Sequence, residues 1–193
     1  LQGVGLADSG GPSITPINLL VVYTSQARQG AGGSDGIASL VDAMVAEVRA
    51  KWGLVECLVN NAGIVADAQM KNMTEDQFDR VINVNLKSAY LFCREAVPTM
   101  IAGGGGAIVN TASVAATQNR RGTDQGPYSM TKYAVLSLTE ALEPELAGTN
   151  VGVTALCPGP IATNLAQGAR HRPDHLGGPE LRPAAEAVMA ERL

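Results

Sequence analysis

Residues 55–63, which read VECLVNNAG, decide the fold class of this 193-residue chain. The apolar, β-rich run from Val55 to Val59 predicts a short buried strand, and the residues from Asn60 to Gly63 are types that end one. A helix is predicted just before this strand, with Gly53 as its stop. Its apolar residues recur at helical spacing, at Leu40, Val41, Met44, Val45, Val48 and Trp52.

Strands and helices alternate on both sides of this segment. Further strands are predicted at residues 17–23, 107–111 and 151–156, and further helices at about 74–100, 128–147 and 183–193. Thr74 with Gln77 three residues later forms a capping box, which marks a helix start. Because helices separate consecutive strands, the pattern predicts an α/β fold, a doubly wound parallel sheet with helices on both faces.

The composition indicates a folded domain and excludes several classes of protein. Hydrophobic residues make up 46% of the chain and charged residues 17%, which is enough apolar material for a core. The net charge of −4 offers no basic patch for nucleic acid, and no apolar run approaches the roughly 18 residues of a membrane span. The three widely spaced cysteines favour reduced thiols and therefore a cytoplasmic location.

Tyr128 and Lys132 are the first candidates for chemistry. Residues four apart lie on one face of a helix, and an ammonium group one turn away is expected to lower the pKa of the phenol. Such a phenol could exchange a proton near neutral pH, although a surface pair is the commoner meaning of this spacing alone. Asn61, Ser113 and Pro158 follow predicted strands, where ligand sites of parallel sheets form.

Five motifs in order resemble the short-chain dehydrogenase/reductase family. The resemblance implies a Rossmann-type fold, NAD or NADP as cofactor, and hydride transfer between a secondary alcohol and a ketone. It also implies a small-molecule alcohol or carbonyl substrate and association into a homo-oligomer. The matching motifs are LVNNAG (58–63), VNL (84–86), IVNTAS (108–113), YSMTK (128–132) and CPGPIATN (157–164).

The resemblance assigns four catalytic residues. Tyr128 would be the acid/base, and Lys132 would hold the nicotinamide ribose and lower the pKa of the phenol. Ser113 would polarise the substrate carbonyl by a hydrogen bond. Asn85 would hold a water molecule that links Lys132 to solvent. The alternatives to these roles are a helix cap for Ser113 and a solvated helix residue for Asn85.

The resemblance also assigns cofactor contacts beyond Tyr128 and Lys132. They comprise Asn61, Ala62 and Gly63 on the adenosine-ribose side, Pro158, Gly159 and Ile161 beside the nicotinamide, and Thr163 at its carboxamide or the phosphate. The chain would divide into a poorly defined segment, 1–38, and a catalytic core, 39–193, with a substrate lid near 160–180. His171 and His175 read as exposed loop residues, so no metal site is expected.

The chain departs from the family at its front end. The family's Gly-rich turn, T-G-x-x-x-G-x-G, has no clear counterpart here. The nearest match, Gly32 to Ala38, stands only 24 residues before Asn60, counted from Gly36, and is interpreted as coincidental. In another register, Val4 to Asp8 would be the family's second strand. The sheet is therefore expected to lack edge elements.

Pro144 is expected to kink the helix that starts near Tyr128 and so to weaken subunit packing. Two alternatives to a dehydrogenase stay open. One is a non-catalytic family member or fragment that cannot bind the pyrophosphate and acts at most as a binding module. The other is an α/β hydrolase with Ser113 as nucleophile, which the missing G-x-S-x-G elbow disfavours.

Overall fold

The structure is a computed structural model of the whole chain. It describes residues 19–22, 34–65, 68, 70–116 and 126–159. The chain divides into two compact units, Leu1–Cys157 and Pro158–Leu193. Of the second unit, only Pro158 and Gly159 lie among the described residues. The description of the fold therefore concerns the first unit.

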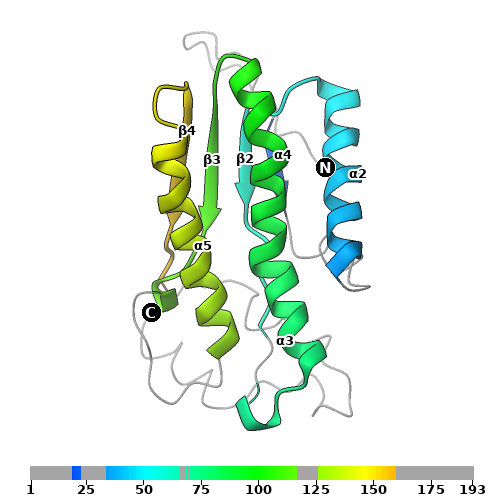
Figure 1. The fold of residues 1–193 in the computed structure, drawn as a ribbon, viewed down its shortest axis with the longest axis vertical. Helices are drawn as coiled ribbons and strands as arrows, with labels where there is room; N and C mark the ends of the chain where they lie inside the picture. The colour runs from blue at the N-terminus through cyan, green and yellow to red at the C-terminus, as the bar shows by residue number, and fades with distance from the viewer. Residues whose placement is uncertain (1–18, 23–33, 66–67, 69, 117–125, 160–193) are drawn as a thin grey trace, which may run out of the picture. The chain divides into compact units, whose positions relative to one another are not determined.

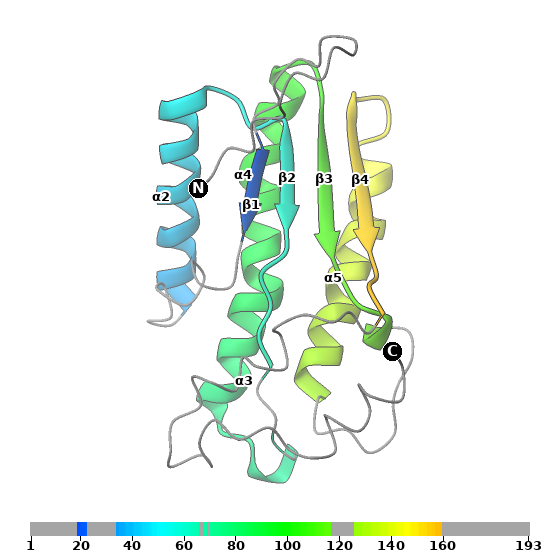
Figure 2. The ribbon, with the colours of Figure 1, turned by 180° about the vertical axis from the view of Figure 1, so that it is seen from behind.

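Four parallel strands form the sheet of the first unit (Figures 1 and 2). They are β1 (Leu19–Val22), β2 (Cys57–Asn60), β3 (Gly106–Thr111) and β4 (Val151–Leu156), and they lie side by side in that order. The register sets Leu20 opposite Leu58, and Leu58 opposite Ile108. The predicted all-parallel α/β sheet is confirmed. Strand β2 begins at Cys57 and runs through Asn60, so its expected start at Val55 is wrong.

Helices follow each of the first three strands. They are α2 (Ser34–Trp52), α3 (Glu75–Ile82), α4 (Ser88–Ala102) and α5 (Gly126–Glu145), with short turns η1 (Met70–Asn72), η2 (Asn83–Lys87) and η3 (Val114–Ala116). The predicted capping box is present, because Gln77 N–H donates to Thr74 Oγ1 at 3.2 Å and Thr74 N–H donates to Gln77 Oε1 at 2.9 Å. The expected single helix over 74–100 is interrupted at η2, which is π-helical.

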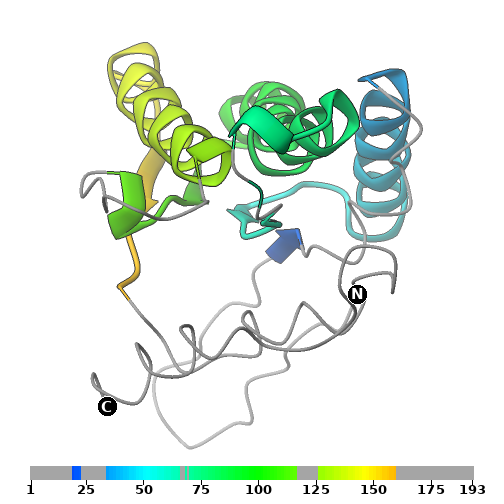
Figure 3. The ribbon, with the colours of Figure 1, turned by 90° about the horizontal axis from the view of Figure 1, so that it is seen from below.

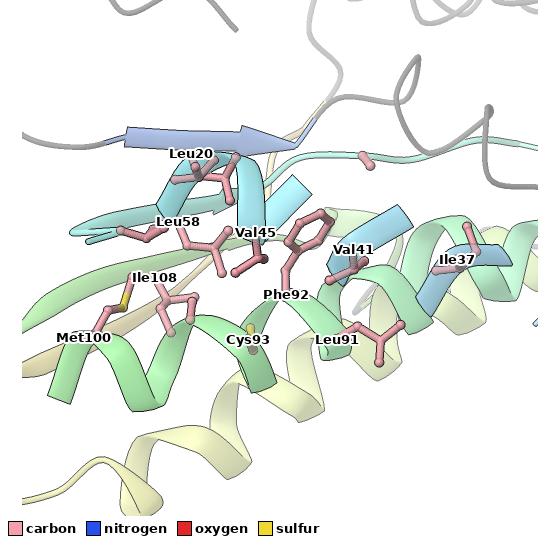
Figure 4. Close-up of a cluster of buried hydrophobic side chains, with 14 of the residues drawn as sticks. Leu20, Ile37, Val41, Val45, Leu58, Leu91, Phe92, Cys93, Met100 and Ile108 are labelled. Carbon is pink, nitrogen blue, oxygen red and sulfur yellow. The ribbon is translucent and has the colours of Figure 1, made fainter. Parts of the chain in front are cut away.

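The main core lies between the sheet and the helices α2 and α4 (Figure 4). Leu20, Leu58 and Ile108 point from three neighbouring strands toward this layer, and Val41 of α2 and Phe92 of α4 pack against them. All five side chains are fully buried. Burying a side chain of this size stabilises the fold by about 1.5–3 kcal/mol. The alternation of buried and half-buried residues along β2 and β3 shows that this face of the sheet is the inner one.

Helices α2, α4 and α5 lie along one face of the sheet, as the view along the sheet shows (Figure 3). Right-handed crossovers put every helix on the same face as long as successive strands are added in one direction. The order β1-β2-β3-β4 never reverses, so the described residues place helices on one face only. Helices on both faces, the doubly wound arrangement, need a reversal of strand order.

Two predicted features near the ends of helices take a different form. Pro144 lies inside α5 as expected, but in its last turn, one residue before the helix ends at Glu145, and the kink itself stays a prediction. Gly36, part of the nearest match to the Gly-rich turn, lies in the first turn of α2. Helix α2 thus begins ahead of residue 39, the expected start of the core. The alternative strand Val4 to Asp8 lies outside the described residues.

Candidate active site

The carboxyl ends of β2 and β3 meet the start of α5, and this junction gathers the predicted catalytic groups. Asn61 follows β2, and its Oδ1 atom accepts a hydrogen bond of 3.3 Å from Thr111 Oγ1 at the end of β3. Lys132 Nζ donates to the backbone oxygen of the same threonine at 2.7 Å. Two strands and one helix are therefore tied together at Thr111.

Tyr128 and Ser113 meet at this junction, since their side chains are hydrogen-bonded to each other. Helix α5 supplies the tyrosine, and the segment between β3 and η3 supplies the serine. Burial raises the pKa of Tyr128 above its ordinary value, and the hydrogen bond from Ser113 only partly opposes that rise. The expectation that Lys132 lowers the pKa of this phenol is therefore wrong.

The burial of the Lys132 side chain explains why its ammonium group does not lower the pKa of the Tyr128 phenol. Its side chain is only 3% exposed, and burial lowers the pKa of Lys132 to about 8. Nζ lies over the Tyr128 ring, 5.8 Å from its centre. Much of the positive charge is thus lost above pH 8, and desolvation of the phenol is the larger effect.

Gly63 makes room for the lysine. A Cβ atom placed on Gly63 would stand 3.3 Å from Lys132 Nζ and 3.6 Å from its Cε, and the first of these distances is tighter than ordinary van der Waals contact. The family resemblance assigns this glycine to the cofactor, because a missing side chain lets backbone and ligand approach. In the structure, the space beside Gly63 holds the Lys132 amine.

Asn85 lies in the π-helical turn η2 and is buried, so a solvated helix position is wrong for it. Its Oδ1 accepts from the backbone N–H of Ile64 at 2.8 Å, and its Nδ2 donates to the backbone oxygen of Ile64 at 2.9 Å. Nδ2 also donates to Thr131 Oγ1 at 3.1 Å. The amide side chain thus holds the segment after β2 against α5. Its predicted role in binding a water molecule stays a prediction.

A buried polar row under the site was not foreseen from the sequence. Asn60 Nδ2 donates to Asn110 Oδ1 at 2.8 Å, and Asn110 Nδ2 donates to Thr139 Oγ1 at 3.0 Å. Cys93 Sγ accepts from Asn60 at 3.4 Å, and burial raises the pKa of Cys93 to about 11. Asn60 and Asn110 are paired in the register of β2 and β3. The signal available in the sequence was a Val-Asn pair near the end of each of these predicted strands.

The other predicted site residues are placed less fully. Ala62 is buried between Asn61 and Gly63. Pro158 and Gly159 start the second unit, so their assigned cofactor contacts stay predictions. The same holds for residues outside the described ranges, namely Ile161, Thr163, His171 and His175.

Neither a metal cluster nor a membrane span is found in the described part of the chain. No three His, Cys, Asp or Glu side chains there gather closely enough to hold a metal ion. None of the helices described there is both long and apolar enough to cross a bilayer.

Comparison with known proteins places this arrangement in a family. Residues 37–174 match the family model of the short chain dehydrogenases. A 3-oxoacyl-(acyl-carrier-protein) reductase, FabG, from Thermotoga maritima is 40% identical over 124 residues, which are 64% of this chain and 50% of that protein. A 2-(R)-hydroxypropyl-CoM dehydrogenase from Xanthobacter autotrophicus is 36% identical over 155 residues, 79% of this chain and 59% of that protein.

The fold agrees with these matches. A crystal structure of a short-chain dehydrogenase/reductase from Burkholderia xenovorans superposes with a TM-score of 0.68 at 28% identity, over 81% of this chain and 57% of the other. The chain thus spans about half the length of the curated relatives it matches. With the parallel sheet and the Ser113, Tyr128 and Lys132 junction, the match over residues 37–174 shows that the chain belongs to the short-chain dehydrogenase family, with its Rossmann-type fold.

Proposed function

We propose that the chain carries the catalytic centre of an NAD(P)-dependent oxidoreductase that interconverts a secondary alcohol and a ketone. The observation that supports this most is the meeting of three groups from separate segments: the Ser113 hydroxyl, the Tyr128 phenol and the buried Lys132 amine. A donor, an acid/base and a cation close together are what reduction of a carbonyl needs.

Tyr128 would give a proton to the carbonyl oxygen during reduction and take it back during oxidation. Its raised pKa keeps the phenol protonated at neutral pH, which suits the donor role. Ser113 would hold the same oxygen through a hydrogen bond and stabilise the negative charge that develops on it. Both groups stand at the carboxyl edge of the sheet, where Asn61 and Thr111 are also found.

The groups at this edge fit the nicotinamide half of a dinucleotide. The Lys132 amine can leave the Thr111 carbonyl for a ribose hydroxyl, and Gly63 beside the amine adds no side chain. Asn61 and Ala62 would line the neighbouring ribose, with Pro158, Gly159, Ile161 and Thr163 as the contacts implied on the nicotinamide side. The bound dinucleotide would supply or accept the hydride.

A non-catalytic relative is the second candidate, and the sheet topology favours it. Dinucleotides bind where the strand order of an open sheet reverses, and the four described strands run in one direction without a reversal. Under this second candidate, the protein would bind a small carbonyl compound or no ligand at all. Self-association through α5, which the resemblance implies, applies to either candidate.

Titration of the purified chain with NADH and NADPH, followed by nicotinamide fluorescence, separates the two candidates. The oxidoreductase proposal expects a saturable signal with one of them and turnover of a 3-oxoacyl-(acyl-carrier-protein), the substrate in the name of one relative. Tyr128→Phe should keep binding and lose turnover by about 100-fold or more. Tyr133→Phe is the matched control, because Tyr133 lies on the same helix and is exposed. No saturable signal with either dinucleotide would refute the proposal.

A further inference from the structure

Thr131 has no part in the chemistry described above, yet it is completely buried beside Tyr128 and Lys132, with 0% of its surface exposed. Its Oγ1 accepts a hydrogen bond from Asn85 Nδ2 at 3.1 Å and donates one to the backbone oxygen of Tyr128 at 2.8 Å. A hydroxyl has one proton and two lone pairs, so both bonds form at once. The Thr131 hydroxyl therefore joins the first turns of α5 to η2.

Asn85 extends this connection to the segment after β2. Its amide pairs with both backbone groups of Ile64, as a neighbouring strand would. One Nδ2 proton serves Ile64 and the other serves Thr131, so the donors of the amide are fully used. Gly63, next to Ile64, lies against the Lys132 amine. The contacts of Ile64, Asn85 and Thr131 thus determine how closely Gly63 covers Lys132.

We propose that Thr131 is a positioning residue: through Asn85, its hydroxyl holds the start of α5 against residues 61–64 and keeps the Lys132 amine covered at the Thr111 carbonyl. The importance of Thr131 for turnover rests on the function proposed above. Its effect on the placement of Lys132 does not, because that placement is a property of the chain without ligand. Valine has the shape of threonine without the hydroxyl, so the two roles of Thr131, filling space and hydrogen bonding, can be separated.

Titration of Lys132 by NMR reads this placement directly. The chain has four lysines, Lys51, Lys71, Lys87 and Lys132, so carbon-13 labelling at lysine Cε gives few signals. The Lys132 signal is assigned by its loss in Lys132→Arg. The groups that the contacts place against its amine are the Thr111 carbonyl from β3, the Tyr128 ring from α5 and Gly63 after β2. None of them is a carboxylate, so the titration midpoint reports access of water.

The wild-type midpoint should lie near the lowered pKa of about 8. In Thr131→Val, the midpoint should rise by about one pH unit or more toward the ordinary value, because water reaches the amine. Exchange of the Ile64 amide proton should quicken about tenfold, as Asn85 loses one hydrogen bond. Thr131→Ser, which restores the hydroxyl, should return both readouts to the wild-type values.

Thr139→Val is the matched control. Thr139 is a second buried threonine of α5, and its hydroxyl likewise accepts from an asparagine, Asn110, and donates to a backbone oxygen, that of Val135. Thr139→Val should lower the stability of the protein about as much as Thr131→Val does, and it should leave the Lys132 titration midpoint unchanged. If Thr131→Val does not fold, Thr131→Ala, which removes the hydroxyl and leaves less bulk, is read in the same titration.

The proposal would be overturned if the variant without the hydroxyl kept both the Lys132 titration midpoint and the Ile64 amide exchange rate of the wild type. It would also be overturned if Thr131→Ser gave the same values as Thr131→Val. Neither readout needs dinucleotide or substrate, so both remain decisive if the proposed function fails. Where the wild-type chain does turn over, Thr131→Val should lower kcat about tenfold, keep KM within about twofold, and recover with Thr131→Ser. Full activity in Thr131→Val would also contradict the proposal.

Discussion

Replacing Lys132 by methionine should make the protein more stable at neutral pH. The amine is almost fully buried, and folding lowers its pKa from the ordinary value of 10.5 to about 8. Each pKa unit corresponds to 1.36 kcal/mol, so protonated Lys132 costs the folded state about 3 kcal/mol at pH 7. Methionine has a similar length and no charge, and Lys132→Met should remove this cost.

The sign of the pH dependence follows from the two protonation states. Between about pH 8 and pH 10.5, the unfolded chain holds a proton that folded Lys132 has released, so the wild-type free energy of unfolding rises with pH. The penalty is complete below pH 8 and disappears as the pH approaches 10.5. The advantage of Lys132→Met should therefore be about 3 kcal/mol at pH 7 and fall below half of that at pH 9.5.

One contact lowers the gain. Lys132 Nζ donates to the Thr111 oxygen at 2.7 Å, and methionine cannot, so about 1–2 kcal/mol is lost at every pH. The net stabilisation by Lys132→Met at pH 7 is then about 1–2 kcal/mol. The decrease of this advantage between pH 7 and pH 9.5 is unaffected, because the lost hydrogen bond costs the same at each pH. Shifts of other groups, such as Cys93, cancel in the difference between variant and wild type.

Urea denaturation followed by circular dichroism at pH 7 and pH 9.5 measures both quantities. Lys71→Met is the control, because Lys71 is exposed, and it should change the free energy of unfolding by less than about 0.5 kcal/mol. A Lys132→Met protein that is less stable than wild type at pH 7, with a difference that does not vary with pH, would refute the account of Lys132 as a buried, poorly solvated cation.

Three further outcomes are expected. Asn85→Leu should lower the free energy of unfolding by about 2–4 kcal/mol in urea, because both backbone groups of Ile64 lose their partner; an unchanged value would contradict the contacts of Asn85. Gly63→Ala should cost about 1 kcal/mol in the same assay, since its Cβ meets Lys132, whereas Gly152→Ala, with open space around it, should be neutral. At pH 8, Ellman's reagent should label exposed Cys157 quickly and buried Cys93, whose pKa is raised to about 11, only in denaturant; rapid labelling of Cys93 in the native protein would show that it is accessible.

Features that depend on neighbours in the chain could be predicted from the sequence. The capping box at Thr74 and the strands ending at Thr111 and Leu156 are local patterns of side-chain type and period, and the structure contains each of them. The spacing of Tyr128 and Lys132 likewise fixes their common helix face once the helix forms. Alternation of strands and helices was sufficient to predict the parallel sheet.

The protonation states of the site residues could not be predicted from the sequence. The rise in the pKa of Tyr128 and the fall in that of Lys132 come from desolvation by segments distant along the chain, which a one-turn spacing cannot reveal. Asn85 forms hydrogen bonds with Ile64 and Thr131, which are 21 and 46 residues away from it in the sequence.

Strand order is set in the same way. Each strand of this sheet reads as a short apolar run whichever neighbour it pairs with, so the sequence by itself determined that the chain alternates strands and helices. Only the tertiary structure decided that β1 pairs with β2 and that the described order never reverses. Pairing and burial are long-range properties, and they depend on which surfaces meet after the local elements have formed.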